Sequence, residues 1–113
     1  MLAGSWVTAT IAKDGTQSAE VDLGRPYDTL LMVIPTIDTA QVTIQIAEKS
    51  GGTFQDLYIT DVADGGNNKA ITASGTGALT WVVPLGGIQY IKVSTSAAQT
   101  TAAVAVRVCG VRE

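Results

Sequence analysis

Hydrophobic and polar side chains alternate with a period of two along much of the chain. In "WVTATIA", Val7, Ala9 and Ile11 fall on one side and two threonines fall on the other. The stretches "AEVDLG" and "QVTIQIAE" repeat this alternation with acidic residues, Gln and Thr at the polar positions. Such a pattern is typical of a strand with one buried face and one solvated face. No window carries apolar residues at helical spacing over several turns, so we expect no significant helix.

Two stretches depart from simple alternation. "TLLMVI" (29–34) is apolar at consecutive positions, which predicts a central strand that is covered on two sides, or covered on one side and packed against a partner. "ALTWVVP" (78–84) behaves alike, with Leu79, Trp81 and Val83 on one face. Pro35 and Pro84 follow these runs and are expected to stop them, because proline donates no hydrogen bond to a ladder.

Turn-forming residues separate the apolar runs at 13–16, 23–28, 49–53, 63–69, 73–77 and 84–87. Short runs divided by such turns predict eight or nine short strands. Aromatic residues make up only 5% of the 113 residues, so Val, Ile, Leu and Ala must fill most of the core. Small core residues fit two closely spaced layers. We therefore expect an all-β fold, an antiparallel, jelly-roll-like β-sandwich, in a single domain over residues 1–113.

The distribution of charge excludes several classes of partner. Net charge is −3, the charged fraction is 15%, and seven Lys and Arg are scattered along the chain. No basic stripe is present, so we expect neither nucleic-acid binding nor binding to a membrane surface. Average domains carry roughly 25% charged residues, and a charge-poor surface favours a protein partner. The longest apolar run, residues 30–35, is too short to span a bilayer, and the N-terminus lacks the features of a signal peptide.

Candidate chemistry is sparse. The chain has no histidine and one cysteine, Cys109, which we expect to be a small buried hydrophobe near the end of the last strand. Oxygen ligands for calcium are present in one loop, at Asp61, Asp64, Asn67 and Asn68. The spacing of a helix–loop–helix calcium site is missing, so a solvated turn is favoured over an ion site. No acids pair across a cleft, and we expect no catalytic, cofactor-binding or metal-binding residues.

Aromatic side chains leave carbohydrate binding open as an alternative, since many sugar-binding modules stack sugars on exposed rings in a β-sandwich. The candidates are Trp6, Tyr27, Tyr58, Trp81 and Tyr90. Each lies in or beside an apolar run, which favours a place in the core or in an interface.

Two longer stretches carry a resemblance to a known class of proteins. The segments "IQIAEKSGGTFQDLYITD" (44–61) and "GGIQYIKVSTSAAQTTAAVAVRV" (86–108) resemble small β-sandwich structural proteins of tailed bacteriophages and prophages. The shared order is a strand, a Gly-rich turn, a Thr-Phe-x-x-Leu-Tyr motif, an aromatic strand, a polar turn and a final Val/Ala strand. The segment after Tyr58 is longer here than in that pattern.

The resemblance implies a virion component without catalytic activity, most simply a capsid decoration protein. It implies a protein made in the host cytoplasm that reaches the virion. We expect a homo-oligomer, with a trimer favoured, that also contacts a major capsid or tail protein. A tail or baseplate module and a carbohydrate-binding module that contacts the host surface are the alternatives.

Two segments offer candidate interface residues. Residues 1–6 form a candidate N-terminal arm with Met1, Leu2 and Trp6, whose exposure would gain a monomer nothing. The last strand, within 102–111, places Val104, Val106 and Val108 on one face. Its opposite face carries small residues suited to close approach by another subunit, namely Ala103 and Ala105.

Overall fold

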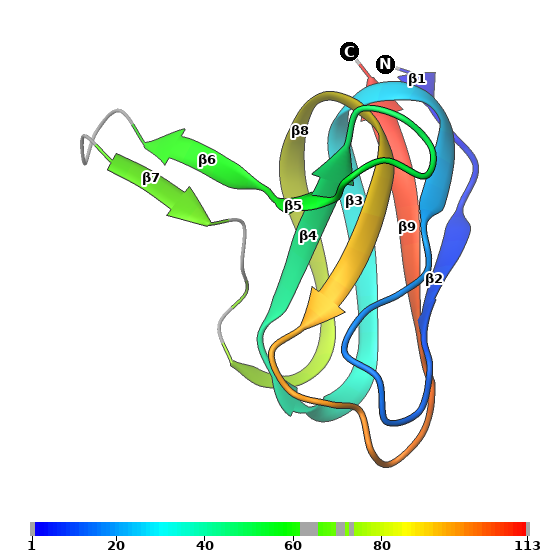
Figure 1. The fold of residues 1–113 in the computed structure, drawn as a ribbon, viewed down its shortest axis with the longest axis vertical. Helices are drawn as coiled ribbons and strands as arrows, with labels where there is room; N and C mark the ends of the chain where they lie inside the picture. Colours follow the sequence, from blue (N-terminus) through cyan, green and yellow to red (C-terminus); the bar gives the residue numbers. More distant parts are fainter. Residues whose placement is uncertain (1, 62–65, 70–71, 73, 113) are drawn as a thin grey trace.

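A computed structural model describes residues 2–61, 66–69, 72 and 74–112, and these residues form strands connected by turns (Figure 1). No helix occurs among them, which confirms the expected all-β, antiparallel class. The strands are β1 (Leu2–Ala3), β2 (Val7–Ile11), β3 (Val21–Ala40), β4 (Val42–Ala47), β5 (Gln55–Asp56), β6 (Tyr58–Asp61), β7 (Gly66–Lys69), β8 (Gly75–Thr95) and β9 (Val104–Arg112).

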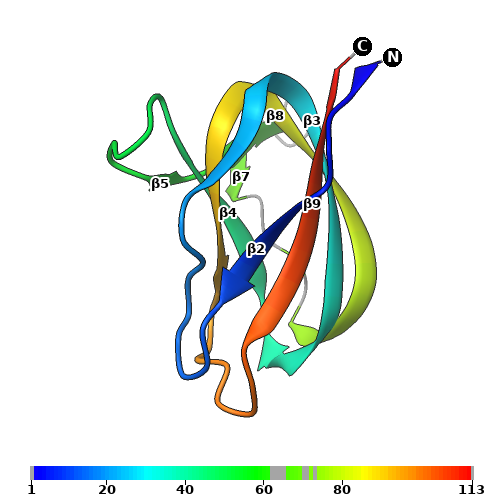
Figure 2. The same cartoon turned by 90° about the vertical axis from the view of Figure 1, so that its right-hand side faces the viewer.

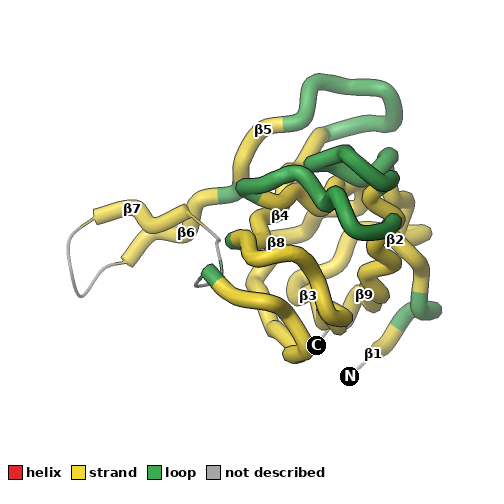
Figure 3. The backbone as a smooth tube through the Cα atoms, turned by 90° about the horizontal axis from the view of Figure 1, so that it is seen from below, coloured by secondary structure: helices red, strands yellow, loops and turns green. Residues whose placement is uncertain are grey.

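Seven of these strands form one hydrogen-bonded sheet in the order β1-β9-β3-β8-β4-β5, with β2 also paired to β9. Every pairing is antiparallel. Strands β6 and β7 pair only with each other among the described residues. They form a hairpin that projects from the body of the molecule (Figures 1 and 3).

The prediction of short strands is wrong for β3 and β8, which run for 20 and 21 residues. The turn signals at 23–28 and 84–87 do not end strands. They act as irregularities within them, where the pairing of Asp22 with Tyr90 shifts to that of Tyr27 with Ile88. Glycines with positive φ at these points, Gly24 and Gly86 among them, let the two strands bend together.

Pro35 and Pro84, which were expected to end strands, lie inside β3 and β8, and each lies where one side of its strand has no paired neighbour among the described residues. Pro84 pairs with Thr29 of β3, and no strand pairs with β8 on the other side there among the described residues. Pro35 lies beyond Val33, where the pairing of β3 with β9 ends. A proline is tolerated where one side of the strand needs no ladder hydrogen bond.

The bends in β3 and β8 fold the single sheet over on itself (Figure 2). One half, which we call the first wall, contains β2, β9, residues 29–34 of β3 and residues 79–84 of β8. The other half, the second wall, contains the start of β3, residues 90–95 of β8, β4 and β5. The core fills the space between the two walls.

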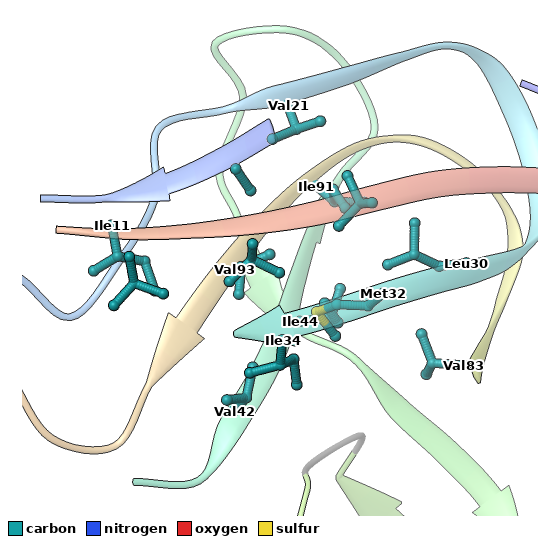
Figure 4. Close-up of a cluster of buried hydrophobic side chains, with 14 of the residues drawn as sticks. Ile11, Val21, Leu30, Met32, Ile34, Val42, Ile44, Val83, Ile91 and Val93 are labelled. Carbon is teal, nitrogen blue, oxygen red and sulfur yellow. The ribbon is translucent and has the colours of Figure 1, made fainter. Parts of the chain in front are cut away.

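Aliphatic side chains from both walls meet in the core (Figure 4). Leu30, Met32 and Ile34 extend from the first wall, and Ile44 and Ile91 from the second, each at most 2% exposed. Each such side chain contributes about 1.5–3 kcal/mol through burial. The predicted alternation is confirmed at the last strand, where Val104, Val106 and Val108 are buried.

A buried amide ties the turn before β9 to the end of β3. Gln99 is 1% exposed, accepts a hydrogen bond from the backbone N–H of Asp38 at 2.8 Å, and donates to the carbonyl oxygen of Ala97 at 3.1 Å. The Asp38 carboxylate in turn accepts from the hydroxyl and the backbone N–H of Thr101, and these bonds hold the pKa of Asp38 below its ordinary value. The polar turn thereby fixes where β9 begins.

Candidate interface surface

The outward side of the first wall is a sheet face that no described element of the subunit covers completely. Antiparallel partners lie directly opposite each other and share a face. The pairings therefore place Thr8, Arg107, Val33 and Thr80 in one row across four strands. A second row contains Cys109, Leu31 and Val82. We call the following residues the outer face: Thr8, Thr10, Leu31, Val33, Thr80, Val82, Ala105 and Arg107.

The outer face carries exposed aliphatic side chains beside its threonines. Val82 is 57% exposed and Val33 is 38% exposed, and Leu31 is half-buried. Arg107 is the one charged member of the outer face as defined above. An exposed apolar patch that spans neighbouring strands is typical of a protein contact surface. For "TLLMVI", the structure shows a strand with one side buried in the core and the other side partly exposed, and the packing of that second side against a partner stays a prediction.

The predicted interface alanines lie at or next to this surface. Ala105 is exposed and pairs with Thr10 on the outer face, and Ala103 is exposed just before β9 begins. Their role in an interface stays a prediction. Val33 and Val82 were not among the predicted site residues. The sequence showed them only as members of two mostly apolar runs, 29–34 and 78–84, and did not show which side of each strand is exposed.

The described part of the N-terminal arm packs against its own domain. Leu2 and Ala3 form β1, which pairs with the end of β9, and the N–H of Gly4 donates to the carbonyl oxygen of Gly110 at 2.8 Å. Met1 lies outside the described residues. Trp6 is 45% exposed and is the largest exposed side chain in the described part of the arm, where Ala3 and Ser5 are exposed as well. The role of the arm in an interface stays a prediction.

A buried tyrosine holds the arm and β9 together. Tyr27 is 4% exposed, and its ring lies against both Gly4 and Gly110. A Cβ atom added at Gly110 would overlap the ring, with Tyr27 Cε2 only 2.7 Å away. Cys109 is 3% exposed and its thiol donates to the carbonyl oxygen of Gly4 at 3.3 Å, which confirms the expected buried cysteine. Glycine is required at both contacts because the strands approach the ring so closely.

The acidic residues with perturbed pKa values serve as hydrogen-bond acceptors for turns. Glu20 accepts from the Ser50 hydroxyl at 2.6 Å and the Gly51 N–H at 2.7 Å, which lowers its pKa. Asp22 accepts from the Gln89 amide at 2.9 Å, and this bond, with one from the Gly24 N–H, lowers its pKa. A lowered pKa keeps both carboxylates ionised, which suits structural acceptors better than proton transfer.

The candidates for carbohydrate stacking are dispersed. Tyr27 is buried, Trp81 packs against the core and Tyr90 is half-buried. Trp6 and Tyr58 are 45% and 57% exposed, but one precedes β2 and the other begins the projecting hairpin. A shallow cavity of about 450 Å³ has no aromatic side chain in its lining; its residues are Ile46, Ala47, Glu48, Lys49, Gly52, Thr53, Gln55 and Ile88.

Two further predictions concern ions and membranes. The described residues contain no cluster of three or more His, Cys, Asp or Glu residues that could hold a metal ion. Asp64 and the side chains of Asp61, Asn67 and Asn68 lie outside the described part, so the ion site in that loop stays a prediction. Within the described ranges, the structure contains no helix with the length and hydropathy needed to cross a membrane.

Comparison with known proteins gives a likeness of fold. No family model matches the sequence, and no curated protein matches it. The crystal structure of the SPBc2 prophage-derived protein YomS is similar in fold, with a TM-score of 0.64 and 15% sequence identity. The match covers 97% of this chain and 95% of that chain. The two proteins therefore share an architecture over nearly their whole lengths.

Proposed function

We propose that this chain is a non-enzymatic structural protein of a bacteriophage virion, most simply a capsid decoration protein. It acts through symmetric contacts between subunits and through contacts with the major capsid protein. The observation that carries the proposal is the apolar part of the outer face, where the exposed Val82 lies opposite Leu31 and diagonally across from the exposed Val33 on the adjacent strand. Burial of such a surface favours association by about 25 cal/mol per Å² of apolar area.

The outer face is smaller than the area that a stable protein–protein interface usually buries. Four strands about 4.8 Å apart, each with about six residues at about 3.3 Å, give roughly 400 Å² of projected surface. A standard specific interface buries about 800 Å² per partner. The outer face therefore needs a second element to make a stable contact, and a symmetric oligomer supplies one by presenting several copies at once. A trimer is the oligomer that we propose.

The fold likeness supports a phage role, since the similar structure is that of a prophage-derived protein. On this proposal the folded sheet serves as a jelly-roll-like sandwich, and the protein is made in the host cytoplasm and ends in the virion. A tail or baseplate protein would use the same surface. The location of the protein in the particle distinguishes this alternative from a capsid decoration protein.

A carbohydrate-binding module is the second candidate function. The exposed rings of Trp6 and Tyr58 favour it, because exposed aromatic side chains can stack on sugars. A glycan array tests this candidate, and it gains support only if replacement of Trp6 or Tyr58 by alanine abolishes the signal.

The direct test is to purify particles from the phage or lysogen that encodes the chain and to locate the protein by antibody labelling. We expect label on the head surface, and loss of the protein from particles when Val33→Lys and Val82→Lys are introduced together. The double variant Ala12→Lys and Thr16→Lys is the matched control, since both residues are exposed in the turn between β2 and β3 and lie outside the outer face. Recovery only in the soluble lysate, or normal incorporation of the double variant, would overturn the proposal.

A further inference from the structure

In the first wall, the outermost strand on one side is β8, and its outer edge is unpaired among the described residues. Residues 79–84 of β8 pair with β3 on one side, and no described strand pairs with them on the other. We call this open side the free edge of β8. An edge strand presents alternate N–H and C=O groups without partners, which makes it a template for pairing with another chain.

The free edge carries one of the features that usually protect such edges, Pro84 at its end, and lacks the others. No charged residue occurs from Gly75 to Ile91. Thr80 is exposed and Val82 is 57% exposed, so water reaches the strand. Proteins commonly blunt an exposed edge with lysine, with proline or by shortening the strand. At the opposite ends of the sheet, β1 and β5 are only two residues long, whereas the free edge is long and ends at Pro84.

The projecting hairpin is the complementary element. Strands β6 and β7 have four residues each and are paired from Tyr58 with Lys69 to Asp61 with Gly66. The hairpin stands away from the sheet in two views (Figures 1 and 3), and Tyr58 is 57% exposed. A two-stranded hairpin is marginally stable in water by itself, and three or more strands or packing against another element stabilise it.

We propose that the β6–β7 hairpin of one copy adds to the free edge of β8 in the next copy. Each subunit then gives one hairpin and receives one, so the two contacting surfaces differ. A contact between unlike surfaces generates a closed ring when the rotation between copies closes. The added hairpin also extends the first wall, and with it the outer face, across neighbouring copies. The inference concerns self-association and does not depend on the proposed virion role.

Two variants separate the two sides of the contact. The first shortens the hairpin by replacing residues 59–68 with Asn-Gly, which can form a tight turn between the paired Tyr58 and Lys69. The second carries Thr80→Lys and Val82→Lys on the free edge. Light scattering after size exclusion should show an oligomer for the unaltered chain and the 11.6 kDa monomer mass, reduced by the deletion, for the shortened one. The edge variant should also be monomeric.

The matched control is the double variant Ala12→Lys and Thr16→Lys. Both residues are exposed in the turn between β2 and β3, outside the outer face and outside the free edge. The control should keep the oligomer mass, because it adds the same charge without touching the free edge. Circular dichroism establishes that each variant is folded.

Mixing the two monomeric variants gives the sharpest result. The shortened chain keeps its free edge and the edge variant keeps its hairpin, so one productive contact remains between them. An equimolar mixture should form a 1:1 dimer and nothing larger. A mixture that stays monomeric, a monomeric unaltered chain, or an oligomer that persists in the shortened chain would overturn the inference. The last result would indicate pairing of two β8 edges or packing of two outer faces.

Hydrogen exchange on the unaltered chain decides the matter if a variant fails to fold. Amides in 79–83 and 58–61 should exchange more slowly at high protein concentration than after dilution, because the added strand protects both segments. Exchange that is independent of concentration would overturn the inference. Absence of the protein from particles would leave these results unchanged, so the two proposals fail separately.

Discussion

Two neighbouring residues of β3 test the division of the first wall into a buried side and an open side. Met32 is fully buried between the walls, and Val33 is 38% exposed on the outer face. Met32→Ala removes core contacts and leaves a cavity, which costs about 3 kcal/mol. Val33→Ala removes about two methylene equivalents at about 0.8 kcal/mol each, and partial exposure reduces the loss to about 1 kcal/mol.

The assay is chemical denaturation at low protein concentration, where contacts between copies contribute little, with thermal unfolding beside it. At roughly 4 °C per kcal/mol for a chain of this size, Met32→Ala should lower Tm by about 12 °C and Val33→Ala by about 4 °C. Equal losses for the two variants would refute the reasoning, because they would mean that both sides of the strand are covered within one subunit. A loss below about 1 kcal/mol at Met32 would refute the packed interior.

Three further substitutions probe the contacts that shape the fold. Gly110→Ala places a Cβ inside the Tyr27 ring and should lower the free energy of unfolding by about 1–3 kcal/mol; an unchanged denaturation midpoint would contradict this contact. Gln99→Ala leaves the Asp38 N–H without its buried acceptor and should cost about 1–3 kcal/mol, whereas a loss confined to experimental error would show that water replaces the amide. The Asp38 carboxylate has a lowered pKa in the folded state, so its stabilisation is present above the unfolded pKa and is lost as pH falls through the folded value, below 3.8. Asp38→Asn should therefore be less stable at neutral pH and should lose less stability on acidification than the unaltered chain; parallel curves of unfolding free energy against pH would contradict this assignment.

The alternation of side chains was enough to predict the β class and the inward side of several strands. Ala9 and Ile11 are buried, as the pattern of "WVTATIA" predicts, because a period of two matches the pleat of a strand. The continuity of β3 and β8 was not predictable in the same way. Residues such as Gly24 and Gly86 fit a turn between two strands and a bend inside one strand equally well. Which of the two forms depends on whether β3 and β8 pair on both sides of the glycine, and these strands are far apart in the sequence.

The β6–β7 hairpin and the outer face are two other features that the sequence did not predict. Residues 66–69 of β7 have the composition of a turn, and they become a strand through pairing with β6, without an apolar alternation. The apolar run at 29–34 did predict that one side of its strand faces the core. Whether the other side is covered depends on which elements lie above it in space, and local sequence carries no such information. Val33 and Val82 therefore emerge as candidate contact residues only from the structure.

The central claim is that the outer face stays apolar in order to bind a neighbour in an assembled particle. Hydroxyl-radical footprinting of the isolated protein and of purified particles tests it most directly. Val33 and Val82 should react in the isolated protein, where both are exposed, and should lose most of that reactivity in the particle. Equal reactivity of these two residues in both states, with protection found elsewhere on the surface, would contradict the account.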